Sequence, residues 1–78
     1  MRYIQLKNKI LKLENDVRFL IVNNHYKNLS AQIKYSNDWL DCYMDLQALR
    51  GKFELDEDKD PLYTKLRQIR KELAYIRG

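Results

Sequence analysis

The chain has few of the residues that cross-link small folds or form tight turns. Its 78 residues include one cysteine, one proline, two glycines and one histidine. A lone cysteine excludes an internal disulfide, and Cys42 with His25 gives too few ligands for a zinc site. Two glycines cannot build a glycine-rich phosphate loop. We therefore expect no metal, no cofactor and no enzymatic activity.

Long apolar runs are also missing. The longest covers only residues 19–22, whereas a membrane-spanning helix needs about 20 apolar residues. We expect no membrane contact. The single cysteine and the lack of a signal peptide favour a reducing, cytoplasmic setting.

Apolar residues recur in alternating steps of three and four in two stretches, which places them along one side of a helix. The N-terminal stripe is Tyr3, Leu6, Ile10, Leu13, Val17 and Leu20, and the C-terminal stripe is Leu62, Leu66, Ile69, Leu73 and Ile76. The pattern predicts a single all-α domain over residues 1–78, a three-helix fold. In the predicted arrangement, long N- and C-terminal helices pack antiparallel with their stripes facing, and a shorter middle helix lies across them.

Turn-forming and capping residues set the predicted helix bounds. The first helix is expected at about 2–23, before an Asn-rich connection, although 19–22 also suits a short strand. The middle helix is expected at 37–50, after capping side chains at 36–38 and before a C-terminal cap at Gly51. Its extension back to residue 30 stays open, because 29–35 also fits a strand alternation. Asp60 and Pro61 begin a third helix at 61–77 after an acidic loop at 52–60.

Charge is unevenly distributed along a chain of net charge +4. Five acids lie in the loop, and the spacing of Asp56, Asp58 and Asp60 resembles half of a calcium-binding loop. The glycine and glutamate of such a loop are replaced by Pro61 and Arg67, so we predict a solvated loop with a helix cap. A second acidic group lies on one face of the middle helix, either solvated or beside cations of the neighbouring helices; it comprises Asp38, Asp41 and Asp45.

Both terminal helices are rich in lysine and arginine, which leads to the first functional hypothesis. The cations expected to form one basic strip are Lys9, Lys12, Lys65, Arg67, Arg70 and Lys71. Such a strip attracts DNA or RNA by releasing counterions, and Tyr63, Tyr75 or Tyr26 would stack on bases. The hypothesis is an accessory factor in nucleic-acid metabolism; the alternative is that these cations only solubilise the helices.

The second hypothesis is a protein-interaction adaptor or inhibitor that binds a larger protein. It would use apolar stripe surface that the fold leaves uncovered, or exposed aromatic side chains, which are common anchors in interfaces. The aromatic candidates are Trp39, Tyr63 and Tyr75. Trp39 is expected either as a core anchor or as an exposed contact. A chain this short buries a modest core, so we expect a monomer or a weak homodimer.

Overall fold

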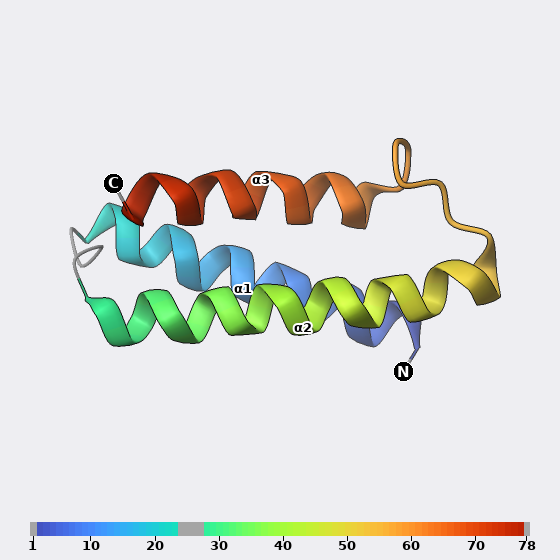
Figure 1. Cartoon of the computed structure of the whole chain (residues 1–78), viewed down its shortest axis with the longest axis horizontal. Helices are drawn as coiled ribbons and strands as arrows, with labels where there is room; N and C mark the ends of the chain where they lie inside the picture. Colours follow the sequence, from blue (N-terminus) through green and yellow to red (C-terminus); the bar gives the residue numbers. More distant parts are fainter. Residues whose placement is uncertain (1, 24–27, 78) are drawn as a thin grey trace.

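The computed structural model describes residues 2–23 and 28–77. It contains α1 (Tyr3–Val22), α2 (Leu29–Phe53) and α3 (Pro61–Arg77), and the described residues form no strand. The helices lie side by side along the long axis of a body that measures 38 × 21 × 16 Å (Figure 1). The predicted all-α, three-helix fold is confirmed. None of the described helices is long and apolar enough to cross a membrane.

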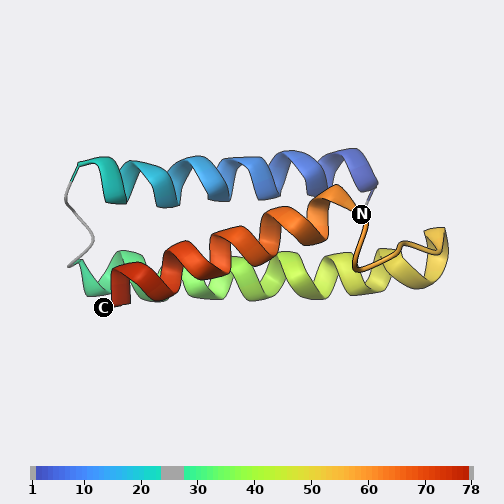
Figure 2. The same cartoon turned by 90° about the horizontal axis from the view of Figure 1, so that it is seen from above.

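The first and third helices run parallel, so the predicted antiparallel packing is wrong (Figure 2). At one end, the Tyr3 hydroxyl donates to an Asp60 carboxylate oxygen at 3.3 Å, which joins the starts of α1 and α3. Toward the other end, Arg18 lies 3.6 Å from Glu72. The reason is topological: each of the two connections reverses the chain, so two reversals restore the first direction.

The middle helix is the longest of the three, contrary to the prediction of a shorter one. α2 has 25 residues, against 20 in α1 and 17 in α3. It begins seven residues before the capping side chains expected at 36–38, because the Asn28 side chain accepts a hydrogen bond from the Ala31 amide at 3.1 Å. Residues 29–35 are therefore helical, and α2 lies alongside its neighbours rather than across them.

The predicted C-terminal cap at Gly51 is also wrong, since α2 continues to Phe53. The helix ends at Glu54, which takes the left-handed conformation with a φ of 53°. Its amide donates to the Arg50 carbonyl. A glycine inside a helix costs only about 1 kcal/mol, so the helix passes through Gly51 and the loop covers residues 54–60.

The two predicted stripes form the core, as expected. Their members are buried except Tyr3, which is partly buried. The middle helix adds Cys42, Leu46 and Leu49. The apolar run at 19–22 is helical but is not covered all round, because Phe19 and Val22 are 63% and 77% exposed.

The start of α3 follows the prediction closely. The Asp60 carboxylate accepts a hydrogen bond from the Leu62 amide at 2.9 Å, and Pro61 is the first helical residue. In the preceding loop, the Asp56 side chain accepts from the Asp58 amide at 2.9 Å. No group of three or more metal-ligating side chains is found among the described residues. The aspartates here make turn and cap hydrogen bonds.

Candidate functional site

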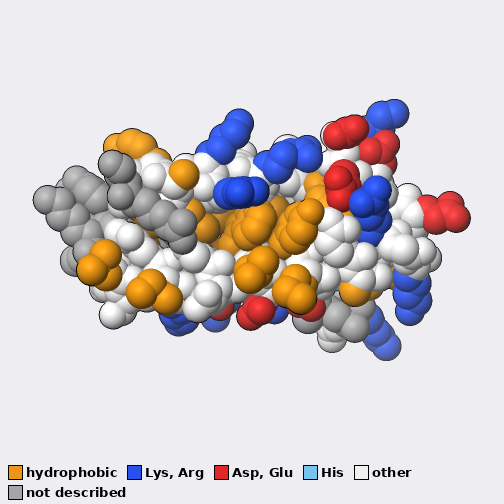
Figure 3. Space-filling model, in the orientation of Figure 1, with side chains coloured by type: hydrophobic (Ala, Val, Ile, Leu, Met, Phe, Trp, Pro, Cys, Tyr) orange, Lys and Arg blue, Asp and Glu red, His pale blue; other side chains and the backbone are white. Residues whose placement is uncertain are grey.

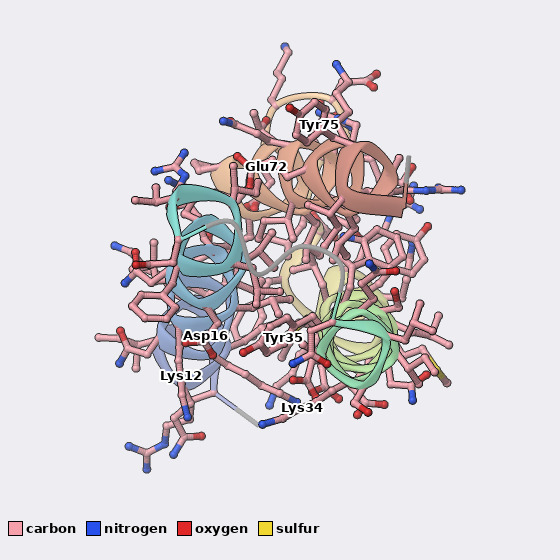
Figure 4. The ribbon with its side chains drawn as sticks, turned by 90° about the vertical axis from the view of Figure 1, so that its left-hand side faces the viewer. Lys12, Asp16, Lys34, Tyr35, Glu72 and Tyr75 are labelled. Carbon is pink, nitrogen blue, oxygen red and sulfur yellow. The ribbon has the colours of Figure 1, made fainter. Side chains whose placement is uncertain are left out.

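The six cations predicted to form one basic strip are spread over three sides of the bundle. Lys9 faces α2, where its ammonium lies 3.2 Å from an Asp45 carboxylate oxygen. Burial opposes the charge on Lys9, but the hydrogen bond from Lys9 to Asp45 and the carboxylates nearby raise its pKa overall. Lys12 is exposed on the same α1/α2 side, which faces away from α3 (Figure 4). These two lysines therefore cannot share a surface with α3.

Lys65 belongs to an ionic network between α1 and α3. Its ammonium lies 3.0 Å from both carboxylate oxygens of Glu14, whose side chain is only 6% exposed. Arg18 bridges Glu14 and Glu72, at 3.6 Å from each. Lys65 thus neutralises a buried carboxylate and contributes to helix packing.

The other three predicted cations lie together on α3. Arg67, Arg70 and Lys71 are exposed, and their spacing places them on the same side of the helix. None of them takes part in an ion pair within the described part of the chain. Arg67 donates to the Glu57 backbone oxygen at 2.9 Å. These cations are therefore available to an anionic partner.

Two adjoining hollows lie between α2 and α3, and together they form the α2/α3 groove. Their volumes are about 480 and 460 Å³. Both are lined by Trp39, Leu40 and Arg70; the first also reaches Leu73, and the second also reaches Tyr63 and Glu57, whose carboxylate is paired with Arg50 at 2.7 Å. Hydrophobic side chains gather along this line, and lysines and arginines stand along its α3 edge (Figure 3). The groove thus has an apolar floor and one basic rim.

Trp39 is fixed in place at the centre of the α2/α3 groove. Its indole nitrogen donates to the Leu66 backbone oxygen at 2.6 Å. Its ring stacks on Tyr43 with centroids 5.3 Å apart and an interplanar angle of 10°. The Arg70 guanidinium lies 5.5 Å from the Trp39 ring centroid, within cation–π range. Trp39 therefore presents a rigid aromatic surface whose only hydrogen-bond donor is already used.

The two tyrosines predicted at an interface differ in burial. Tyr63 is 3% exposed and packs edge-on against Tyr43, so it belongs to the core and is not a free stacking surface. Its buried hydroxyl has no hydrogen-bond partner in the part of the chain that the structure describes. Burial raises the pKa of Tyr63, and nearby Glu57 raises it further. Tyr75 is 70% exposed and points outward from α3 (Figure 4). Tyr26 lies outside the described residues.

Four large apolar side chains on one side of α2 are exposed. Leu29, Ile33, Leu40 and Met44 are 71%, 63%, 50% and 61% exposed. Their spacing places them along one side of α2, opposite the buried Cys42, Leu46 and Leu49; we call these four the outer stripe of α2. The sequence does contain a signal for this exposed stripe, because α2 carries two apolar stripes and its two neighbouring helices cover only one of them.

The acidic group on α2 was predicted to be either solvated or beside cations of the neighbouring helices. The second alternative holds for Asp45, which is paired with Lys9. A smaller hollow of about 220 Å³ between α1 and α2 contains Asp38 with Lys12 and Lys34 on its lining. Tyr35 lies between these helices (Figure 4), and burial followed by the charges of Asp16 and Asp38 raises its pKa. This side of the bundle is internally compensated in charge.

The one cysteine is shielded from solvent. Cys42 has no exposed surface, and burial raises the pKa of its thiol to about 11. A protonated, inaccessible thiol is a poor nucleophile. His25 lies outside the described residues.

No protein-family model, curated protein or solved structure matches this chain.

Proposed function

We propose that this chain is a small non-enzymatic protein-interaction module that works through one side of the bundle, the α2/α3 face. This face consists of the α2/α3 groove, the outer stripe of α2 and the cations Arg67, Arg70 and Lys71. The observation that carries the proposal is that exposed apolar side chains lie on one surface with cations that have no carboxylate partner among residues 2–23 and 28–77.

Two physical arguments support this use of the face. Soluble monomers rarely expose contiguous apolar patches without a function, and interface centres are enriched in tryptophan, tyrosine and arginine. The face combines the large exposed side chains Leu40 and Met44 with Trp39 and Arg70. A partner that covers them would remove apolar area from water and would pair with cations held in place by the helix.

Affinity capture from a lysate of the source cells, compared between matched variants, tests the proposal. Leu40→Asp places a carboxylate in the face, whereas Phe19→Asp places one on α1, in exchange for an apolar side chain of similar exposure. We expect Leu40→Asp to lose proteins that both the parent and Phe19→Asp retain. Equal capture by all three would contradict the proposal, provided that circular dichroism shows all three to be folded.

Nucleic-acid binding is the second candidate function. The observation in its favour is the row of Arg67, Arg70 and Lys71 on α3, which form no ion pair with any described residue, on a helix that also exposes Tyr75. A nucleic acid bound there would depend strongly on salt. Gel-shift titrations at two salt concentrations test it, with Lys71→Glu against Lys12→Glu, which changes the net charge equally on the α1/α2 side. Loss of binding in Lys71→Glu alone supports a specific site on α3, and equal loss in both indicates diffuse attraction.

A further inference from the structure

We infer that the α2/α3 face binds an amphipathic helix with acidic residues along one edge, which packs beside α2 and α3 as a fourth helix. The inference rests on the proposed protein-interaction function and specifies the chemistry of the partner.

The shape of the face fits an elongated occupant. The two hollows of the α2/α3 groove adjoin at Trp39 and Arg70 and follow the line between two helices that lie side by side. The outer stripe of α2 extends the apolar surface from Leu29 to Met44, a length of about 22 Å at 1.5 Å per residue. A helix of about four turns would cover this length, with its apolar side chains in the hollows.

The charges set the orientation of that helix about its own axis. Arg67 and Arg70 line the α3 side of the groove, and Leu40 lines its α2 side. The exposed Lys71 follows Arg70 on the outer surface of α3, and the exposed Met44 continues the outer stripe of α2 one turn beyond Leu40. An occupant therefore needs carboxylates on the edge that meets α3 and apolar residues on the edge that meets α2. Carboxylates are favoured over hydroxyls or amides, because none of the three cations has an ion-pair partner within the described residues.

Arg70 has a particular part in this arrangement. Its guanidinium lies over the Trp39 ring. A stacked guanidinium can still donate hydrogen bonds in its own plane to a carboxylate, and Arg70 forms no ion pair with the described residues. Trp39 cannot contribute a hydrogen bond, since its indole nitrogen already donates to Leu66. The partner is therefore expected to place an apolar side chain against Trp39 and a carboxylate beside Arg70.

A second copy of the chain fits this face less well. In a two-fold dimer with antiparallel α2 helices, the row of Arg67, Arg70 and Lys71 lies on the same side as its counterpart, where the cations repel. In a parallel dimer the row faces the α1/α2 side, where Lys9 is paired with Asp45 and lies near Asp41, and where Asp38 shares a hollow with Lys12 and Lys34. A separate acidic helix meets neither difficulty.

The chain contains one tryptophan, so its emission reports on the groove directly. The probes are two synthetic 18-residue helical peptides that contain no tryptophan and share the same leucine stripe; one carries glutamates and the other lysines along one edge. We expect the acidic peptide to shift Trp39 emission saturably and to bind at least tenfold more tightly than the basic peptide. Binding of the basic peptide with equal affinity would overturn the inference.

Charge-reversal variants test the location. Arg67→Glu with Lys71→Glu removes two cations without touching Trp39, and we expect at least a tenfold loss of affinity for the acidic peptide. Lys12→Glu with Lys7→Glu is the matched control, because both lysines are exposed on α1 outside the groove, and we expect less than a threefold change. Equal losses in both pairs would overturn the inference, because they would show attraction by net charge alone.

The remaining outcomes separate this inference from the proposed function. If the acidic peptide leaves Trp39 emission unchanged while Leu40→Asp still loses captured proteins, the partner has another chemistry and the function stands. A concentration-dependent dimer in sedimentation, abolished by Leu40→Asp, would make a second copy the occupant and overturn the inference. Salt-dependent binding of nucleic acid that blocks the acidic peptide would overturn it in favour of the second candidate function.

Discussion

The guanidinium carbon of Arg70 lies 5.5 Å from the centre of the Trp39 ring, at the point where the two hollows between α2 and α3 adjoin. The two residues are 31 positions apart in the chain and on different helices. Their contact joins the aromatic floor of the groove to its basic rim. An apolar group and an anion on one partner would therefore meet matching groups a few ångströms apart.

The hydrogen bond from Trp39 to Leu66 should contribute to stability. Trp39→Phe keeps an aromatic ring but removes the indole donor that lies 2.6 Å from the Leu66 oxygen. We expect a loss of about 1–2 kcal/mol in the free energy of unfolding. Urea denaturation followed by circular dichroism measures it, with Tyr75→Phe as an exposed control expected to change stability by less than about 0.5 kcal/mol. A stability equal to the parent would show that the bond is not formed.

The end of α2 offers a paired test of helix length. An added Cβ at Gly51 meets nothing within 4 Å, so Gly51→Ala should stabilise the helix by up to about 1 kcal/mol. Glu54 has a φ of 53°, so Glu54→Gly should relieve strain by a similar amount, about 1 kcal/mol. Thermal denaturation of the single and double variants measures both effects. A helix that ended at Gly51 would give the opposite sign for Gly51→Ala.

Removing one member of the Glu14–Lys65 pair should lower the free energy of unfolding much more than replacing both members by apolar residues. Lys65→Met leaves the buried Glu14 carboxylate with only Arg18, 3.6 Å away, and we expect a loss of about 2–3 kcal/mol. Replacing both members, Glu14→Leu with Lys65→Met, removes the buried charge and should restore most of that loss. Denaturant titrations of the parent, the single variant and the double variant measure the three free energies of unfolding. A double variant as unstable as Lys65→Met alone would contradict the account of this pair.

The buried thiol predicts a decline of stability in alkali. The pKa of Cys42 rises from 9.0 to about 11 on folding, so between these values the folded state holds a proton that the unfolded state has lost. Stability therefore falls as the pH rises from 9 to 11. Unfolding free energies measured across this window should fall less steeply in Cys42→Ala than in the parent. Identical slopes would show that Cys42 does not cause the decline.

The core was predictable because its signal is local. Leu6, Ile10, Leu66 and Ile69 follow a helical period, and a helix must bury the stripe that they form. The direction of α3 was predicted wrongly, although two short reversals imply it. The direction of a helix depends on the path of the chain, whereas an apolar stripe shows only which side of the helix is buried.

The α2/α3 face was harder to predict from the sequence than the core. The second helix has two apolar stripes, and periodicity alone cannot say which of them meets α1 and α3. Leu46 became core and Leu40 became surface because rotation about the helix axis is set by all three helices together. The predicted basic strip likewise combined cations that lie on different sides of the bundle. Lys65 is only two residues from Arg67, yet Lys65 pairs with the buried Glu14 whereas Arg67 is exposed on the outside of α3.

The most direct test of the account is a map of backbone amide chemical shifts as the acidic peptide is added to the protein. The account predicts changes confined to residues 29–44 of α2 and 63–74 of α3, with the largest at Trp39 and Arg70. Changes concentrated on the outer side of α1, around Ile4 and Phe19, or spread evenly over the surface would contradict it.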